Sequence, residues 1–393
     1  MTPAARVQAA IDILDLVIAS SRDNGPAADK IIADWFRTRR FAGSSDRRAV
    51  RELAYGAIRR CGEVPPSGRS AMLSLAQGDA ALTALFDGSP HAPLPIDQGE
   101  PVAAPGIAPA WLELSLRASG IDGDEATALL GRAPLDIRIN TLKAEPTTLE
   151  LPVAGEATMV RNGLRLPQGT QVEQWQAYRD GLVEVQDLGS QLACNAAAAQ
   201  PGETIIDLCA GAGGKTLALA AAMENRGRLI ACDVDRSRLS RLSPRAERAG
   251  VTIAETLLLD PGREAAALSG WQQKADCVLV DAPCSGTGTW RRNPESRWRL
   301  SQDQLSRNIA LQARLIELAA TLVRPGGRLV YVVCSLIDQE GVDQASGFLR
   351  SNDRTWQSDQ LDLSAGRPRG SGLRLTPCHD GTDGFFVARL LRI

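Results

Sequence analysis

The sequence predicts an α/β protein in which an open, mostly parallel sheet follows a small α+β module and an all-helical N-terminal region. Three observations support this prediction. Apolar residues recur at three- and four-residue spacing over residues 4–86, as they do on one face of a helix. Residues 135–140 alternate between apolar and polar, which is typical of a half-buried strand. From about residue 186, strand-like apolar runs alternate with helical segments.

The composition predicts a soluble globular protein. Of 393 residues, 44% are hydrophobic and 23% are charged, and the net charge is −2. No stretch approaches the ~18 apolar residues of a membrane-spanning helix, and Asp12 and Asp15 interrupt the apolar run in which a signal peptide would lie. The eight cysteines contain no C-x-x-C pair and there are two histidines, so neither a zinc site nor a disulfide framework is predicted. We expect a cytoplasmic monomer with no metal and no membrane partner.

Basic side chains cluster in the N-terminal helical domain, predicted over residues 1–88. Between Arg37 and Arg60, eight arginines stand against Asp46 and Glu52, an excess of six positive charges in a slightly acidic chain. Such a cluster is either an ordinary solvated helix face or a surface that contacts the phosphates of a nucleic acid. The arginines for which we predict phosphate contact are Arg39, Arg40 and Arg47.

The next two regions are predicted to be a linker and a small module. Residues 89–109 contain six prolines and two glycines, which indicates an extended linker. Residues 110–185 then combine a helix at 111–130 with short strands near 135–140, 159–160 and 163–166, the pattern of a small α+β module.

Residues 186–393 are predicted to form the open sheet. The runs 277–281 and 328–334 are almost entirely apolar, as expected of central parallel strands that are buried on both faces. The other strands expected are 204–208, 228–233 and 385–390, and the helices are 217–223, 236–250 and 309–323.

A glycine-rich turn separates the first of these strands from its helix. Residues 207–216 read Asp-Leu-Cys-Ala-Gly-Ala-Gly-Gly-Lys-Thr. Small residues let the backbone approach a ligand, and the first amides of the helix point at it. A P-loop would need glycine at Cys209, and a dinucleotide fingerprint would need glycine at Thr216. The turn therefore resembles the cofactor loop of S-adenosylmethionine-dependent methyltransferases, or is merely a tight turn. Its candidate binding residues are Cys209, Ala210, Gly211, Ala212, Gly213, Gly214 and Lys215.

Carboxylates follow the second and third strands. Asp233 ends the strand 228–233, where an acid can accept hydrogen bonds from both hydroxyls of a ribose. Asp235 competes for that role, and its alternative is to cap the following helix. Asp260 lies where the third strand should end and is a candidate for contact with an adenine ring, although a loop aspartate needs no function.

Two cysteines follow the two central strands. Cys284 lies in Asp281-Ala282-Pro283-Cys284-Ser285-Gly286, and Cys334 ends the next apolar run. Because parallel strands end at the same edge of a sheet, both thiols and Asp281 should converge there. Two thiols and a carboxylate suit nucleophilic attack on an electron-poor ring. Either cysteine alone would more readily be a buried structural thiol.

Together these motifs resemble the RsmB/NOP/Sun family of RNA (cytosine-5) methyltransferases. Residues 1–86 are similar to the NusB-like RNA-binding domain of the bacterial RsmB branch of that family. The chain departs from the family in its cofactor loop, where Gly211 and Ala212 replace the usual alanine and proline. The segments that carry the resemblance are 138–143, 185–187, 209–216, 281–286, 290–294, 333–335 and 383–386.

The resemblance implies a class I methyltransferase with a Rossmann-like sheet, which uses S-adenosylmethionine to methylate carbon 5 of a cytosine in RNA. Small-subunit ribosomal RNA is the expected substrate. It also implies that Cys334 attacks carbon 6, that Asp281 contacts N3 and the amino group and binds alongside the cofactor, and that Cys284 assists removal of the proton from carbon 5. Spacing alone does not exclude the exchanged roles, in which Cys284 attacks as in DNA cytosine methyltransferases.

Other functions remain open at this stage. One alternative is a tRNA cytosine-5 methyltransferase. A silent RNA-binding scaffold would more readily have lost one of the two cysteines, and a methyltransferase that acts on proteins or small molecules would lack the pair. The segment 290–299 interleaves Arg291 and Arg292 with Trp290 and Trp298. It is predicted to contact phosphates and stack on bases, and the alternative is a surface loop with buried tryptophans.

Overall fold

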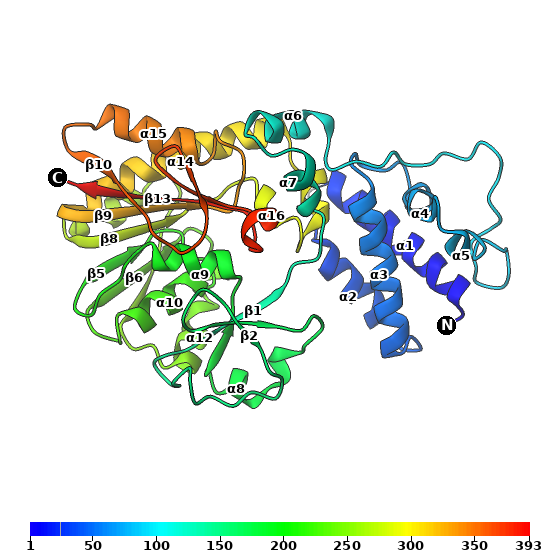
Figure 1. Cartoon of the computed structure of the whole chain (residues 1–393), viewed down its shortest axis with the longest axis horizontal. Coiled ribbons are helices and arrows are strands. Elements are labelled where there is room, and N and C mark those ends of the chain that lie inside the picture. The colour runs from blue at the N-terminus through cyan, green and yellow to red at the C-terminus, as the bar shows by residue number, and fades with distance from the viewer. Residues whose placement is uncertain (24) are drawn as a thin grey trace. The chain divides into compact units, whose positions relative to one another are not determined.

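The chain divides into two compact units in the computed structural model, which describes residues 1–23 and 25–393 (Figure 1). The helical unit comprises Met1–Arg132 and Thr289–Ser301, and the sheet unit comprises Ala133–Gly288 and Gln302–Ile393. This grouping differs from the predicted division at residues 88, 109 and 185, because two further pieces of the chain pack with the N-terminal helices. The predicted domain boundaries remain predictions.

The helical unit is built on the apolar periodicity seen in the sequence. Thr2 caps α1 by accepting a hydrogen bond from the amide of Ala5, and Val7 and Leu14 on that helix are fully buried. They pack in one core with Ile58 of α3 and with residues of α2 and α4. The predicted helical character of residues 4–86 is confirmed. The helices are α1 (Pro3–Arg22), α2 (Ala28–Arg37), α3 (Ser44–Arg60), α4 (Gly68–Ala76), α5 (Ala80–Thr83), α6 (Ala110–Ala118) and α7 (Gly123–Ala128).

The proline-rich stretch 89–109 forms no helix, yet it is attached to the helices at defined points. Pro105 pairs with Cys61 in an isolated β-bridge. Arg69 of α4 donates to Glu100, with 3.0 Å between Nη2 and Oε2. These contacts hold the stretch against the helical unit.

The segment Thr289–Ser301 completes the core of the helical unit. The side chain of Arg297 is fully buried and donates to the carbonyl oxygens of Ile58 at 2.6 Å and Cys61 at 2.8 Å. The indole of Trp298 donates to the carbonyl oxygen of Gly62, just after the end of α3, and its ring packs in the core of the helical unit. Burial lowers the pKa of Arg297 to about 10, a cost that the carbonyl acceptors offset.

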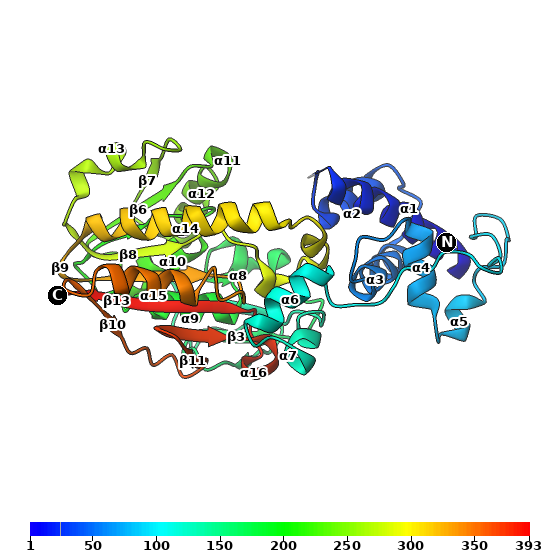
Figure 2. The same cartoon turned by 90° about the horizontal axis from the view of Figure 1, so that it is seen from above.

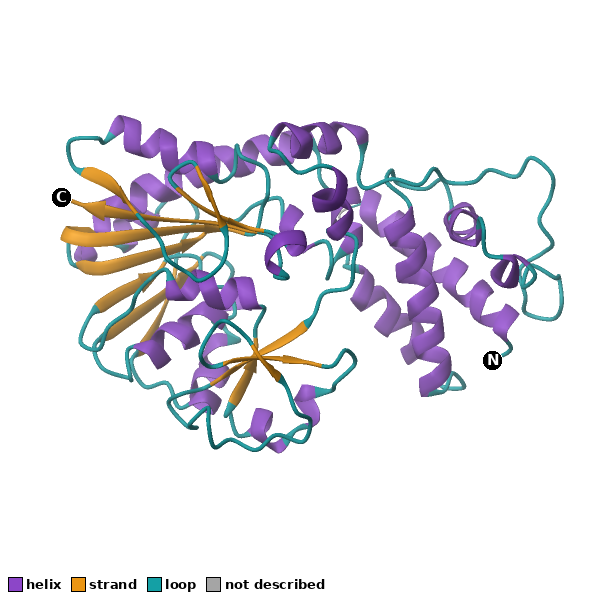
Figure 3. Cartoon of the chain, viewed as in Figure 1, coloured by secondary structure: helices purple, strands orange, loops and turns teal. Residues whose placement is uncertain are grey.

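Two sheets make up the sheet unit (Figure 3). The smaller one is antiparallel, in the order β2-β3-β1-β4, and its strands enclose Ile137, Leu166 and Val183. It confirms the strands predicted near residues 135–140 and 163–166. The elements of this module are β1 (Leu135–Ile139), β2 (Glu156–Ala157), β3 (Gly163–Leu166), α8 (Gln176–Arg179) and β4 (Val183–Val185).

The larger sheet is the predicted open, mostly parallel one. Among the described residues its order is β11-β12-β13-β9-β8-β5-β6-β7, with β10 paired to β13. The run β9-β8-β5-β6-β7 is parallel and β13 is antiparallel to β9. This is a Rossmann-like arrangement. The strands are β5 (Thr204–Asp207), β6 (Arg228–Asp233), β7 (Ala254–Leu258), β8 (Ala275–Asp281), β9 (Val323–Val333), β10 (Trp356–Asp359), β11 (Arg367–Arg369), β12 (Gly372–Leu375) and β13 (Phe385–Arg392).

Helices cover both faces of this sheet because successive strand residues point to opposite sides. Ile206 packs in one apolar cluster with α14 and α15, and Ile205 packs in another with α9 and α10. Figure 2 shows α14 running alongside β8. No helix of the described residues is long and apolar enough to span a bilayer. The helices are α9 (Leu188–Asn195), α10 (Gly214–Ala222), α11 (Arg236–Leu239), α12 (Leu242–Ala249), α13 (Glu264–Ala267), α14 (Gln302–Leu322), α15 (Val342–Ser351) and α16 (Pro377–Asp380).

We predict that Arg297→Lys destabilises the chain. A lysine ammonium cannot reproduce the planar fork that reaches the carbonyls of Ile58 and Cys61, and a buried acceptor left unpaired costs roughly 1–3 kcal/mol. Urea unfolding of the full chain measures the loss. Arg37→Lys, at an exposed ion pair on α2, is the matched control and should change the free energy of unfolding by less than about 0.5 kcal/mol. Equal stability of both variants would contradict this role of Arg297.

Candidate active site

The glycine-rich turn leaves the start of α10 open to a ligand. Gly213 precedes the helix with φ +85°, a left-handed conformation that favours glycine. A Cβ added there would lie 2.6 Å from the side chain of Leu242, whereas one added at Gly214 would meet nothing within 4 Å. Free space in front of the first amides of the helix is what a bound cofactor requires.

Asp233 and Asp235 are used differently in the structure. The carboxylate of Asp233 is buried and accepts hydrogen bonds from the amides of Gly211 and Asp235, each at 2.7 Å. Asp235 instead accepts from the amide of Arg238 and caps α11, which is the alternative role that the sequence offered. Asp260 is exposed just beyond β7. The structure therefore favours Asp233 over Asp235 beside the loop, and the cofactor roles of Asp233 and Asp260 stay predictions.

Asp207, at the end of β5, is a functional candidate that the sequence did not single out. Its side chain is fully buried. One oxygen accepts a hydrogen bond from Thr216 Oγ1 at 2.7 Å, while Oδ1 has no partner among the described residues. Burial raises the pKa of Asp207 to about 7, although the Thr216 hydrogen bond opposes the shift. Because an aspartate at the end of a strand is common, the sequence alone does not mark Asp207 as a functional candidate, and only its burial in the structure does.

Lys215 and Asp281 form an ion pair at the edge of the sheet. Lys215 Nζ lies 2.6 Å from Asp281 Oδ2 and 5.8 Å from the ring centre of Phe385. Burial acts to lower the pKa of Lys215, but the charge of Asp281, its hydrogen bond and the nearby cysteines together outweigh it, so the pKa is raised. The second oxygen of Asp281 receives no hydrogen bond within the described part of the chain, so it is available to a substrate.

The two predicted cysteines lie side by side. Because β8 and β9 are parallel neighbours, the loops that follow them meet, and the sulfur atoms of Cys284 and Cys334 are 3.4 Å apart. Both are free thiols. The pKa of Cys284 is raised well above its usual value by its hydrogen bond with Cys334, by burial and by nearby negative charge. These surroundings favour the neutral form of Cys284, and either sulfur can be the donor in the contact.

A buried glutamate holds the loop of Cys284. Glu340 is completely buried, and its carboxylate accepts hydrogen bonds from the amide of Ser285 at 2.8 Å, from the hydroxyl of Ser285 and from Gln312 Nε2 at 3.1 Å. The hydroxyl of Ser335 lies 3.1 Å from that of Ser285. Glu340 therefore links the two cysteine loops. Nothing in the sequence around Glu340 indicates this contact.

Two glycines bring a third loop against the cysteines. A Cβ on Gly288 would lie 2.1 Å from the carbonyl oxygen of Gly384. The amide of Gly384 donates to Gly288 O at 2.8 Å, and the amide of Gly288 donates to Cys334 O at 3.0 Å. This close approach of backbones explains why the segment 383–386 belongs with the cysteine motifs.

The predicted RNA-contacting arginines fall into two groups. Arg40 and Arg47 are exposed in the helical unit, and Arg39 stacks 4.0 Å from the ring centre of Trp35. Arg291 is buried and Arg292 is half-buried. The roles of all five stay predictions.

The expectation that tryptophans of the segment 290–299 stack on bases is wrong. Trp290 is completely buried and Trp298 is 5% exposed, and Trp298 packs in the apolar core of the helical unit. The alternative, a loop with buried tryptophans, describes this segment.

We predict that the stabilising contribution of Asp207 decreases as the pH rises. Its pKa is about 7 in the folded chain and about 3.9 when unfolded. The folded state therefore binds the proton more tightly. The contribution of Asp207 to the free energy of unfolding is therefore complete below pH 4, and it is lost as the pH rises through 7. Each unit of this shift corresponds to about 1.4 kcal/mol.

Urea unfolding of wild type and Asp207→Asn at pH 5 and pH 8 tests this prediction. The stability of wild type relative to the variant should be higher at pH 5. Asp343→Asn, at an exposed position on α15, controls for the loss of one carboxylate. A wild-type advantage that is constant or grows with pH would show that Asp207 is not protonated on folding.

Comparisons with known proteins agree with this geometry. Residues 195–391 match the family described as 16S rRNA methyltransferase RsmB/F. The chain is 33% identical over 297 residues to ribosomal RNA small subunit methyltransferase B of Xanthomonas campestris, covering 72% of this chain and 66% of that protein. It is 35% identical over 231 residues to the protein of the same name from Citrobacter koseri, covering 59% and 52%. The chain thus spans about half to two thirds of the length of these relatives.

Solved structures are also similar. The crystal structure of PH0851 matches with a TM-score of 0.74 and 26% identity, covering 99% of both chains. That of a methyltransferase homologue from Pyrococcus horikoshii matches with a TM-score of 0.61 and 27% identity, covering 69% of this chain and 90% of the other. The Rossmann-like methyltransferase fold predicted from the sequence is confirmed.

Proposed function

The chain belongs to the 16S rRNA methyltransferase RsmB/F family, and from this premise we propose that it transfers a methyl group from S-adenosylmethionine to carbon 5 of a cytosine in RNA. Small-subunit ribosomal RNA is the proposed substrate, as the names of the relatives suggest. The observation that carries the proposal is the pair of thiols 3.4 Å apart at the edge of the sheet where β8 ends in Asp281.

The cofactor would be held by the turn 209–215 and by Asp233. The open space before Gly214 and the buried carboxylate of Asp233 against Gly211 fit a ligand with a small polar end and a ribose. When bound, S-adenosylmethionine supplies a methyl group activated by its positively charged sulfur. The partly accessible Asp281, beside Lys215, stands where the target base would approach.

The proposed chemistry begins at carbon 6, because carbon 5 of cytosine is a poor nucleophile. The Cys334 thiolate forms a bond with carbon 6, and the ring electrons move to carbon 5, which becomes able to accept the methyl group. The unpartnered oxygen of Asp281 accepts a hydrogen bond from the amino group or from protonated N3 and stabilises this adduct. Carbon 5 then takes the methyl group and leaves the cofactor as S-adenosylhomocysteine. As the bond between carbon 6 and sulfur breaks, Cys284 would donate its proton to the departing sulfur of Cys334, 3.4 Å away. The resulting Cys284 thiolate would accept the proton from carbon 5, which releases 5-methylcytosine.

The surroundings of the pair are compatible with Cys334 as the attacking group, the role that the resemblance gives it. The hydrogen bond with Cys334, burial and the charge of Glu340 raise the pKa of Cys284 and favour its neutral form. Lys215 adds positive charge at the same sheet edge. Cys284 is then placed to act in proton removal after attack, which is the role that the resemblance implies.

The helical unit is the proposed RNA-binding part. Arg40, Arg47 and Phe41 are exposed next to Arg39, and Phe41 is 73% exposed. Guanidinium groups beside an exposed aromatic ring suit the phosphates and unstacked bases of RNA. These contacts would position the RNA, while the sheet unit selects the base.

We predict that Cys334→Ala abolishes methyl transfer and prevents a covalent complex with RNA that carries 5-fluorocytosine. Without the sulfur no bond to carbon 6 forms, so nothing is trapped when fluorine blocks the final elimination. Radiolabelled methyl transfer and a denaturing gel give the two readouts. Cys378→Ala removes an exposed thiol on α16 and should behave as wild type. A covalent complex that persists in Cys334→Ala would overturn this assignment.

We predict that Cys284→Ala accumulates a covalent complex with RNA that carries ordinary cytosine. The attacking thiol remains, whereas the group that assists elimination is gone, and turnover should fall by roughly 10²–10⁴. A denaturing gel, followed by protease digestion of the shifted band, measures the adduct. Normal turnover without an adduct would show that Cys284 is structural or that the two cysteines have exchanged roles.

A further inference from the structure

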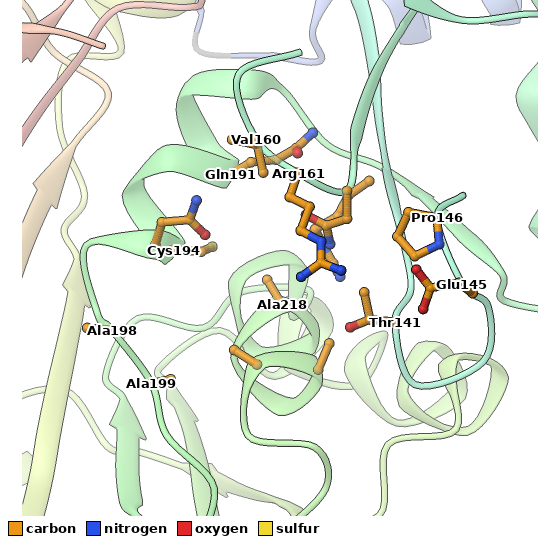
Figure 4. Close-up of a pocket in the computed structure, with 15 residues that line it drawn as sticks. Thr141, Glu145, Pro146, Val160, Arg161, Gln191, Cys194, Ala198, Ala199 and Ala218 are labelled. Carbon is orange, nitrogen blue, oxygen red and sulfur yellow. The ribbon is translucent and has the colours of Figure 1, made fainter. Parts of the chain in front are cut away.

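A cavity of about 480 Å³ lies within the sheet unit, away from the two cysteines (Figure 4). Its lining comes from β1, from the loop before β3, from the end of α9 and from α10. Along one wall, α10 presents Ala218, Ala221 and Ala222. The volume is in the range of small-molecule binding sites, about 300–1,000 Å³, and no residue of the proposed methyl-transfer site lines it.

A buried arginine lines this cavity without using most of its donors. Arg138 on β1 is 4% exposed, and its Nε donates to Gln186 Oε1 at 2.8 Å. Its two terminal nitrogens donate to no group in the described part of the chain. These nitrogens are not among the fully buried side-chain atoms that lack a partner, and Arg138 lines the cavity. Up to four N–H donors of its guanidinium are therefore free to bind a ligand there.

The carboxylate opposite Arg138 in the sheet already accepts hydrogen bonds from two other arginines. Glu184 stands opposite Arg138 in the pairing of β1 with β4 and is itself buried. Its two oxygens accept hydrogen bonds from Arg245, at 2.9 Å, and from Arg248. No hydrogen bond joins Glu184 to Arg138 among the described residues, so the terminal nitrogens of Arg138, which lines the cavity, have no acceptor in this carboxylate.

A second guanidinium enters the same space. Figure 4 shows the side chain of Arg161 reaching from the loop before β3 into the cavity, above Thr141. Glu145 is the carboxylate among the lining residues. Two guanidinium groups against one carboxylate leave the cavity with a net positive charge, which favours an anion.

We propose that this cavity is a phosphate-binding site formed by Arg138 and Arg161. A phosphate offers several acceptor oxygens in the geometry that guanidinium forks match, whereas a carboxylate offers two. The alanine wall of α10 leaves room beside the phosphate for an apolar or ring-shaped remainder, as in a nucleotide. The phosphate belongs either to the RNA backbone or to a free nucleotide. The first of these sources rests on the proposed function, and the site itself does not.

Isothermal titration of inorganic phosphate into the full chain, at constant ionic strength in chloride, tests the proposal. Wild type should bind phosphate. Arg161→Gln removes one guanidinium from an exposed loop position and should weaken binding at least about 10-fold. Ala222→Trp fills the mouth of the cavity from an exposed helix position and should abolish it. Both changes avoid the buried Arg138, so the fold should be retained.

Arg354→Gln is the matched control, because it removes an exposed arginine of the sheet unit outside the cavity. It should bind phosphate as wild type does. The absence of phosphate binding to wild type, or unchanged affinity in both Arg161→Gln and Ala222→Trp, would overturn the proposal. Cys334→Ala should still bind phosphate, so a failed methyl-transfer proposal and a failed phosphate site give different results.

Competition experiments identify the source of the phosphate. If it belongs to the RNA backbone, a short single-stranded RNA displaces inorganic phosphate, and Arg161→Gln and Ala222→Trp weaken RNA binding several-fold. If it belongs to a free nucleotide, adenosine monophosphate displaces inorganic phosphate and both variants bind RNA as wild type does. Both results uphold the site and differ only in its ligand.

Discussion

The parallel pairing of β8 with β9 is the constraint on which the rest of the site depends. It sets Asp281 opposite Val332, so the chain leaves both strands at the same edge and the two loops begin side by side. The sulfur atoms of Cys284 and Cys334 then lie 3.4 Å apart, although 50 residues separate them in sequence. Glu340 and the contact of Gly288 with Gly384 fix the loops in that position, but neither could create it without the pairing of the strands.

Two aspartates lie at this edge of the sheet in different surroundings. Asp207 is fully buried, and its pKa rises to about 7. Asp281 has Lys215 at 2.6 Å and remains partly accessible, so its charge is compensated and open to a ligand. Two aspartates on neighbouring strands thus differ in function because one is buried and the other is paired with a lysine, although the two side chains are chemically identical. The raised pKa of Cys284 also depends on its surroundings, because its hydrogen bond with Cys334, burial and nearby negative charge all favour the neutral form.

The sequence predicted the features that local pattern determines. The apolar runs 277–281 and 328–334 predicted the central strands, and the rule that parallel strands end at one edge of a sheet predicted that Cys284, Cys334 and Asp281 lie together. It did not predict Glu340, whose partner Ser285 is 55 residues away, because a buried carboxylate is recognised only by what surrounds it. It also misjudged the tryptophans of the segment 290–299, since arginines such as Arg297 normally indicate solvent and here satisfy backbone carbonyls in a core.

The course of the chain explains why that segment misled the sequence interpretation. Gly288 is the last residue of its piece of the sheet unit, and Thr289 is the first of a piece that packs with the N-terminal helices. Gly288 accepts a hydrogen bond from Gly384 and donates one to the carbonyl of Cys334. The boundary between the two units therefore lies between Gly288 and Thr289, directly after the residues that contact the cysteine loops. The arginines and tryptophans of a motif that follows a catalytic loop in sequence can therefore stabilise a different unit of the chain. Proximity in sequence alone is poor support for a role in substrate binding.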